Sequence, residues 1–222
     1  MNLILKNAII VDSKSNHHFQ KKDILIKSGI IKKIENDIKA KDEKIISFKN
    51  LHISNGWFDS SVSFGEPGFE ERETLENGLK TSSKSGFTDI ILNPNTNPVI
   101  DSHSSVSHIY KKTNDSATNV HVLASLTKES LGKEIAELYD MHIAGAVAFG
   151  DYKKTLNNSN ILRIALDYVQ SFDGIIMSYP SDFDLSKEGL MHEGSVSLKL
   201  GINGIPEIAE TSILLRDLEI LE

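Results

Sequence analysis

The sequence predicts an α/β protein: an incomplete TIM-barrel-like (β/α) domain of about five βα units, preceded by a small β subdomain. Two observations lead to this prediction. After His52, β-branched runs alternate with helical patterns about five times, as in a parallel sheet or barrel. A closed barrel of eight units needs roughly 250 residues, whereas only about 170 follow His52. We therefore expect a β subdomain over residues 1–51 and a partial barrel over residues 52–222.

The N-terminal subdomain is predicted from short β-rich runs between polar turns. The first run is interrupted midway by a polar pair, and Ser28-Gly29 between two later runs is a hairpin signal. The pattern therefore indicates a small antiparallel sheet. The runs cover residues 3–12, 23–27, 30–34 and 44–48.

The barrel elements follow in alternation. Leu75 and Leu79 lie four residues apart on one helix face, and Ser85-Gly86 ends that helix. Pro206 suits the first position of the last helix. The expected strands are 88–92, 119–124, 146–149 and 174–178. The expected helices are 70–84, 105–112, 128–144, 160–170 and 206–221.

Composition narrows the class of protein. With 39% hydrophobic and 25% charged residues, the chain is typical of a soluble globular protein. A net charge of -7 with dispersed lysines argues against a nucleic-acid partner. The absence of cysteine excludes disulfides and cysteine nucleophiles. We expect a cytoplasmic protein without membrane contact, since no signal-peptide pattern or long apolar run occurs.

The stretch from residue 56 to 68 reads GWFDSSVSFGEPG. It resembles the signature Asp-x-His-x-His-x-Arg-Glu-Pro-Gly, which ends the first barrel strand of dihydroorotases and related cyclic amidohydrolases. The frame is present as Asp59, Glu66, Pro67 and Gly68. Other runs fall in the family's order, among them residues 86–88, 93–99, 145–151, 191–197 and 204–206. The resemblance covers nearly the whole chain and implies that residues 1–51 belong to a β-sandwich.

The positions that would bind metal have changed. The resemblance implies histidines where this chain has Ser61, Ser63 and Tyr179, and a carboxylate where it has Asp151. Hydrolysis of a cyclic amide by zinc, the family's cofactor, needs ligands that fix the ion and leave a position for water. Serine hydroxyls are neutral, weak ligands. We therefore expect no metal, and Asp151 reads either as a solvated or helix-capping group or as a retained ligand.

Substrate binding is also altered. The resemblance implies an arginine at Gly65, which would grip a carboxylate with two hydrogen bonds, and an asparagine that is present as Asn95. Asn95 reads as a substrate-binding residue by resemblance, or as an asparagine that stabilises its own proline-rich turn. Apart from the adjacent loop pair His17 and His18, only His103 and His108 are close in sequence, and a spacing of five does not align them on a helix.

Two functions remain open. In the first, the chain is a dihydroorotase-like protein of pyrimidine biosynthesis that has lost catalysis, has no catalytic residue, and has a structural or regulatory role. Its partner would be aspartate carbamoyltransferase, by resemblance, or a further copy of itself, since an incomplete barrel exposes apolar surface. In the second, it is an active metal-dependent dihydroorotase or cyclic amidase that uses substitute ligands such as His103, His192 and Asp151, or residues beyond Glu222.

Overall fold

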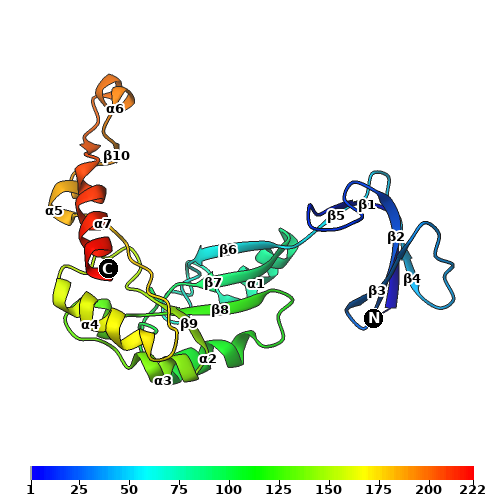
Figure 1. Ribbon diagram of the computed structural model, residues 1–222, viewed down its shortest axis with the longest axis horizontal. Helices are drawn as coiled ribbons and strands as arrows, with labels where there is room; N and C mark the ends of the chain where they lie inside the picture. The colour runs from blue at the N-terminus through cyan, green and yellow to red at the C-terminus, as the bar shows by residue number, and fades with distance from the viewer. Residues whose placement is uncertain (1) are drawn as a thin grey trace. The chain divides into compact units, whose positions relative to one another are not determined.

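The computed structural model describes residues 2–222 and divides into two compact units, Met1–Gly56 and Trp57–Glu222 (Figure 1). The first unit contains a five-stranded sheet, and the second contains a four-stranded sheet and a two-stranded one formed by β10 (Met191–His192) and β11 (Gly204–Ile205). Over the described residues, every helix is too short or too polar to cross a membrane.

The first unit is a five-stranded mixed sheet with the order β3-β2-β1-β4, in which β5 also pairs with β1. The β2–β3 hairpin predicted at Ser28-Gly29 is confirmed. The expectation of a purely antiparallel sheet is wrong, because β4 and β5 both run parallel to β1. A second sandwich layer stays a prediction. The strands are β1 (Asn2–Val11), β2 (Lys21–Lys27), β3 (Ile30–Glu35), β4 (Lys44–Ile46) and β5 (His52–Ser54).

The interruption expected in the first run is an irregularity within one continuous strand. The register of β1 against β2 shifts between Leu5 and Ala8, and Asn7 there has a φ of 53°. The buried carboxylate of Asp23 stabilises this bend by accepting from the backbone N–H of Asn7 at 2.9 Å and from Nζ of Lys6 at 2.5 Å. A polar residue pair therefore bends the strand without ending it.

The second unit is built on four parallel strands in the order β6-β7-β8-β9, as βαβ connections require (Figure 1). The expected fifth strand is present only as a parallel bridge between Phe149 and Ile176. Two backbone hydrogen bonds support it, Phe149 N–H to Ile175 O at 2.9 Å and Met177 N–H to Phe149 O at 2.8 Å. The strands are β6 (Trp57–Val62), β7 (Phe87–Leu92), β8 (Asn119–Ala124) and β9 (Ala146–Phe149).

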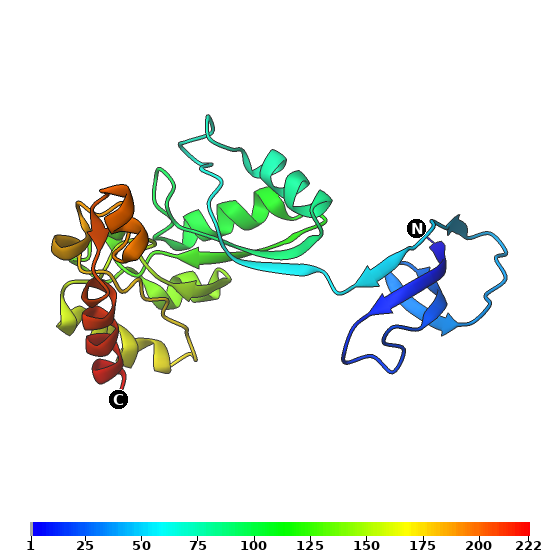
Figure 2. The ribbon, with the colours of Figure 1, turned by 90° about the horizontal axis from the view of Figure 1, so that it is seen from above.

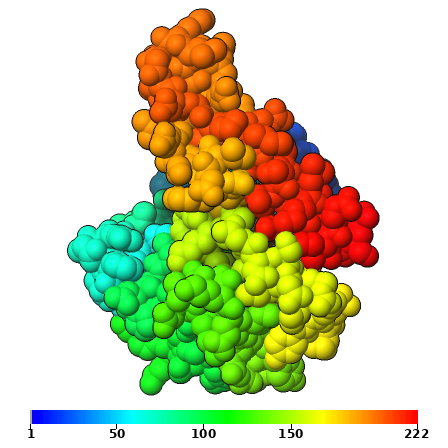
Figure 3. All heavy atoms as spheres, turned by 90° about the vertical axis from the view of Figure 1, so that its left-hand side faces the viewer, coloured from blue at the N-terminus to red at the C-terminus, as the bar shows by residue number. Residues whose placement is uncertain are grey.

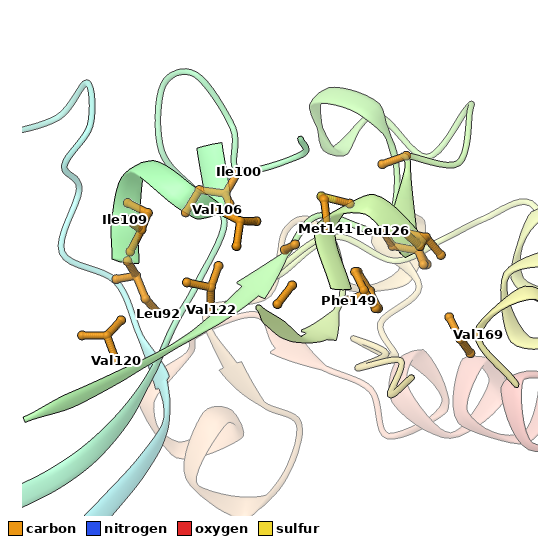
Figure 4. Close-up of a cluster of buried hydrophobic side chains, with 14 of the residues drawn as sticks. Leu92, Ile100, Val106, Ile109, Val120, Val122, Leu126, Met141, Phe149 and Val169 are labelled. Atoms are coloured by element: carbon orange, nitrogen blue, oxygen red, sulfur yellow. The ribbon is translucent and has the colours of Figure 1, made fainter. Parts of the chain in front are cut away.

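Three helices cover one face of this sheet: α1 on β7, α2 on β8 and α3 on β9 (Figure 2). Their apolar faces form the main core with the alternate strand residues that point towards them (Figure 4). Helix α7 packs on α4. The helices are α1 (Leu75–Lys84), α2 (His103–Thr113), α3 (Leu138–Ile143), α4 (Ser159–Gln170), α5 (Phe183–Ser186), α6 (Ser195–Leu200) and α7 (Ile208–Leu221).

Three predicted helices differ from the structure. The last helix begins at Ile208 with Glu207 as its N-cap, so Pro206 precedes it and does not take its first position. The helix expected from residue 70 begins at Leu75, because the side chain of Thr74 caps it by accepting from the N–H of Asn77. The helix expected over 128–144 is wrong for most of its length. Glu129 and Gly132 have φ values of 54° and 68°, which break the chain into a short 3₁₀ turn, Lys128–Ser130, and a loop before α3 begins.

Candidate functional site

In parallel α/β barrels the functional groups come from the carboxyl ends of the strands, so the site is sought there. All five residues singled out from the sequence lie at or just beyond these ends. Two separate hydrogen-bonded clusters are found, one after β6 and β7 and one after β8 and β9. The residues concerned are Ser61, Ser63, Asn95, Asp151 and Tyr179.

The first cluster, here called the serine–asparagine cluster, contains Ser61, Ser63, Asn93 and Asn95. The side-chain N–H₂ of Asn93 donates to both serine hydroxyls, each at 3.2 Å. Ser63 in turn donates to Oδ1 of Asn95 at 2.9 Å. Shared contact with one amide confirms that the two serines point the same way. The cluster is polar but wholly neutral.

Sequence reasoning missed Asn93, the residue that organises this cluster. Its side chain is only 1% exposed, and its backbone N–H donates to Val62 O at 2.8 Å. The available signal was its position, since a polar side chain directly after the buried strand β7 must find hydrogen-bond partners. Two hydroxyls from the neighbouring strand provide them.

The second cluster is organised by Asp151, which follows β9 and is 7% exposed. Its Oδ1 accepts from the Ser125 hydroxyl at 2.8 Å and from the Thr127 N–H at 2.9 Å. Its Oδ2 accepts from the Thr127 hydroxyl at 2.5 Å. The carboxylate therefore ties the loop after β8 to the end of β9, with three of its roughly four acceptor positions in use.

Tyr179 lies beyond the bridge that replaces the fifth strand, and its side chain is exposed. It lines a cavity of about 10 Å³ together with Asp151, Ser178 and Asp217. That volume is close to the minimum that holds one water molecule, roughly 10–15 Å³. The structure thus brings Tyr179 near Asp151, in a space too small for a small-molecule substrate.

These residues do not fit a zinc site. Zinc needs three or four nitrogen, sulfur or carboxylate ligands, whereas the serine–asparagine cluster offers only hydroxyl and amide groups. The described residues, 2–222, hold no group of three or more His, Asp or Glu side chains arranged to bind a metal ion. The two histidines considered from the sequence as substitute ligands belong to different elements. His103 is the first residue of α2, and His192 lies in β10 (Met191–His192).

The backbone at the position of the family's arginine has a conformation that favours glycine. Gly65 has a φ of 122°, and a Cβ placed on it would lie 2.6 Å from the carbonyl oxygen of Phe69. An L-residue would be strained there even before its side chain was considered. The loop is thus built around glycine at this point.

The retained frame residue Glu66 has a structural role in this loop. Its Oε2 accepts from the Leu75 N–H at 2.8 Å, which satisfies the first turn of α1, and its Oε1 accepts from Nζ of Lys112 at 2.5 Å. The hydrogen bond from Lys112 holds the pKa of the Glu66 carboxyl below its usual value. Glu66 therefore joins the loop after β6 to both α1 and α2.

A hydrogen-bonded pair, His121 and Asp89, lies further back along the strands. Nε2 of His121 in β8 is 3.0 Å from Oδ1 of Asp89 in β7. The hydrogen bond with His121 is the main cause of the lowered pKa of Asp89. Both residues lie near the middle or start of their strands, on the face opposite Ile90, and so away from the strand ends where chemistry occurs.

A wider cavity, about 340 Å³, lies between α1 and the strands β6 and β7. Ser63 lines it beside apolar side chains, and Asp59 and Glu73 are its two carboxylates. Both carboxylates already serve local structure, since Asp59 accepts from the Ser61 N–H at 3.0 Å and Glu73 accepts from the Thr74 N–H at 2.9 Å. No ligand is assigned to this cavity.

A parallel sheet of this kind, with helices packed on its strands and polar residues gathered at its strand ends, is typical of part of a (β/α) barrel. Among solved structures, the chain is similar to the L-hydantoinase (dihydropyrimidinase) from Arthrobacter aurescens, with a TM-score of 0.74 at 17% identity. It is also similar to the dihydropyrimidinase from Brevibacillus agri, with a TM-score of 0.70 at 16% identity. These matches cover 99% of this chain but 50% and 49% of those chains, which confirms that the described residues have the fold of part of such a barrel.

Sequence comparison defines the family. The family described as Dihydro-orotase-like matches residues 52–222. Proteins named dihydroorotase from Ruminiclostridium cellulolyticum and Syntrophus aciditrophicus are 35% and 36% identical over 100% of this chain. The chain belongs to the dihydroorotase-like family of cyclic amidohydrolases, as its motifs predict. It spans about half the length of these curated relatives, 52% and 53%.

Proposed function

We propose that this chain is a catalytically inactive dihydroorotase homologue with a structural or regulatory role in pyrimidine biosynthesis. One observation carries the proposal: neutral side chains occupy the positions that would hold metal and substrate. Ser61 and Ser63 stand at two metal-histidine positions, Tyr179 at a third, and Gly65 at the arginine position. The serines are hydrogen-bonded to amides of the same cluster.

The chemistry of the reaction supports loss of activity. Opening a cyclic amide requires a water molecule acidified by a metal or a well-placed general base. The one metal position of the family at which this chain keeps a carboxylate is Asp151, and three donors from Ser125 and Thr127 already engage it. Its geometry suits a structural anchor, because a base must face the reacting group.

Asn95 is the one residue at a family substrate position that keeps its type. Its Oδ1 accepts from Ser63, so part of its hydrogen-bonding capacity is used inside the cluster. We assign Asn95 to the stability of the loop after β7. With no arginine at position 65, a bound carboxylate would lack its strongest partner.

The partner that the family resemblance suggests is aspartate carbamoyltransferase, in the cytoplasm. A protein that keeps its hydrophobic core but lacks the metal-binding and substrate-binding side chains can still bind another subunit. The retained signature residue Glu66 supports a structural role, because its hydrogen bonds join the loop after β6 to α1 and α2.

The test is metal content and turnover measured on the same preparation. The chain is purified without chelator, its zinc, manganese and iron are determined by elemental analysis, and dihydroorotate formation and hydrolysis are assayed with and without added zinc. The Ruminiclostridium cellulolyticum dihydroorotase, prepared identically, is the positive control. We expect no stoichiometric metal and no turnover. Stoichiometric zinc with turnover would establish the active alternative and direct the search for ligands to His103, His192 and Asp151.

A further inference from the structure

The dipeptide Asn-Gly occurs three times in the sequence, at Asn55–Gly56, Asn77–Gly78 and Asn203–Gly204. In such a pair the backbone nitrogen of the glycine can attack the side-chain amide carbon of the asparagine, because glycine has no Cβ to hinder the approach. The attack needs a glycine N–H that is free to lose its proton and a backbone that is free to turn. The fold treats the three pairs differently in both respects.

Asn77–Gly78 is held on every side within α1. The N–H of Gly78 donates to the Thr74 carbonyl at 2.9 Å. The side-chain N–H₂ of Asn77 donates to both carboxylate oxygens of Glu73, at 3.0 and 3.1 Å. A Cβ placed on Gly78 would lie 2.5 Å from the ring of Phe64, so this backbone is also tightly packed. The attacking nitrogen and the amide that would leave are therefore both engaged.

Asn203–Gly204 is held by strand pairing. Gly204 begins β11 and pairs with Met191 of β10, in the orange segment at the top of Figure 3. The Leu190 N–H donates to the Asn203 carbonyl at 3.0 Å. A Cβ placed on Gly204 would lie 2.5 Å from Cα of Glu193, so the neighbouring chain packs directly on this backbone. The pairing opposes the turn that ring closure requires.

Asn55–Gly56 is the least restrained pair. It follows β5 and ends the first unit (Figure 1), and both residues are exposed and belong to no strand. Within the described part of that unit, residues 2–56, the Asn55 side chain and the Gly56 N–H have no hydrogen-bond partner. The Ser54 hydroxyl donates to the backbone carbonyl oxygen of Asn55 at 3.0 Å. This carbonyl belongs to the same peptide group as the Gly56 N–H.

The hydrogen bond from Ser54 favours the attack. When the Gly56 nitrogen loses its proton, the negative charge spreads onto the Asn55 carbonyl oxygen, because the peptide group is conjugated. A hydrogen bond donated to that oxygen stabilises the charged form and so increases the population of the attacking species. Ser54 is thus a positioning residue that acts through the carbonyl of its neighbour.

We propose that Asn55 is a deamidation site whose reaction is accelerated by Ser54. The Gly56 nitrogen gives its proton to a base in the solvent and forms a bond to Cγ of Asn55. The bond from Cγ to Nδ2 breaks, and Nδ2 takes a proton from water and leaves as ammonia. A second water molecule then opens the cyclic imide at either carbonyl, which gives aspartate or isoaspartate.

The product differs from the native chain in charge and in length. The new carboxylate makes the net charge one unit more negative. Isoaspartate also adds one carbon atom to the main chain directly before β6, at the connection between the two units. The proposal is independent of the proposed function, since it depends only on the local structure of Ser54, Asn55 and Gly56.

The experiment compares the three pairs within one molecule. The protein is incubated at mildly alkaline pH, folded and in urea, and then digested with trypsin. The pairs fall on separate tryptic peptides, residues 50–72, 73–80 and 200–216. Liquid chromatography with mass spectrometry measures the conversion of each peptide and separates the aspartate and isoaspartate products. In the folded protein we expect Asn55 to convert at least about tenfold faster than Asn77 and Asn203, whose backbones are held. In urea the three rates should be similar.

Variants at two positions test the role of the hydroxyl. Ser54→Ala should slow the conversion of Asn55 in the folded protein by about two- to tenfold, the effect of one ordinary hydrogen bond. Ser54→Thr keeps the hydroxyl and should convert at close to the native rate. Neither variant should change the rate in urea, where the hydrogen bond is absent. Asn55→Gln should stop the conversion, which assigns it to this residue.

Two sets of results would overturn the proposal. Equal rates for the three pairs in the folded protein, or no conversion at Asn55, would exclude Asn55 as a selective deamidation site. A Ser54→Ala variant that converts at the native rate when folded, or that is slowed equally in urea, would exclude the acceleration by the hydroxyl.

Discussion

The hydroxyl of Ser63 donates a hydrogen bond to Oδ1 of Asn95 at 2.9 Å. By the family resemblance, Ser63 stands where a metal-binding histidine is expected, and Asn95 where a substrate-binding asparagine is expected. The two are bonded to each other, and the buried amide of Asn93 completes the network by donating to Ser63 and Ser61. Groups that would face an ion and a ligand thus stabilise the ends of two neighbouring strands.

Replacing both serines by histidine is expected to increase zinc affinity without restoring turnover. Ser61→His/Ser63→His supplies two imidazoles that point the same way, but a stable site needs at least a third ligand, and Tyr179 and Gly65 remain unchanged. Zinc affinity is measured by competition with a chromogenic chelator, and turnover by the dihydroorotate assay. Ser60→His/Val62→His, with opposite strand positions, is the control. Turnover by the first variant would contradict the view that several positions must be restored together.

Asp151→Asn is expected to lower the free energy of unfolding by about 1.5–3 kcal/mol, the range for a buried hydrogen bond to a charged group. The asparagine side chain has one oxygen and one N–H₂ group. Where the N–H₂ group replaces Oδ2, it cannot accept the hydrogen bond from the Thr127 hydroxyl. Urea unfolding measures the loss. Asp184→Asn, at a side chain that is 90% exposed, should change stability by less than about 0.5 kcal/mol. Equal stabilities for the two variants would rule out the anchoring role.

Much of the fold could be predicted, because the apolar runs in the sequence are the same segments that the folded protein uses as buried strands. The apolar runs at 88–92, 119–124 and 146–149 become β7, β8 and β9 with bounds that differ by at most one residue. The region 128–144 could not be read in the same way. Its loop depends on left-handed conformations at Glu129 and Gly132, and on the anchoring of Thr127 by Asp151, which is distant in sequence.

The site was predictable in position but only partly in its contacts. Strand-end placement follows from alternation and from the signature, so Ser61, Ser63 and Asp151 could be located beforehand. Their hydrogen-bond partners could not be predicted. Asn93 comes next to the two serines, and Thr127 next to Asp151, only when adjacent strands align in the fold. The signature also suggested a lost arginine at Gly65 but gave no sign of the positive φ that the structure has there.

Restoring that arginine is expected to destabilise the protein. Gly65→Arg forces an L-residue to a φ of 122° and brings Cβ to 2.6 Å from Phe69 O, so a loss of about 2 kcal/mol or more is expected in urea unfolding. Gly65→Ala should show most of the same loss, since the backbone causes it. Gly201→Ala, at a φ of 64° with nothing within 4 Å, should cost only about 1 kcal/mol. A fully stable Gly65→Arg variant would show that the loop can adopt another conformation.

The contribution of Glu66 should disappear in acid. Its pKa is lowered in the folded protein by the hydrogen bond from Lys112, so the unfolded chain binds the proton more readily. The stability that the carboxylate provides is therefore complete above its ordinary pKa of 4.5 and is lost as pH falls through the lower folded value. Glu66→Gln should cost about 1–2 kcal/mol at neutral pH, because the charged contacts to Lys112 and the Leu75 N–H weaken. The difference from the native chain, measured by urea unfolding across the acid range, should shrink towards zero at low pH. Glu71→Gln, at a side chain that is 70% exposed, should change stability by less than about 0.5 kcal/mol at neutral pH. A difference that stays constant with pH would mean that packing of the side chain, rather than its charge, joins the loop to α1 and α2.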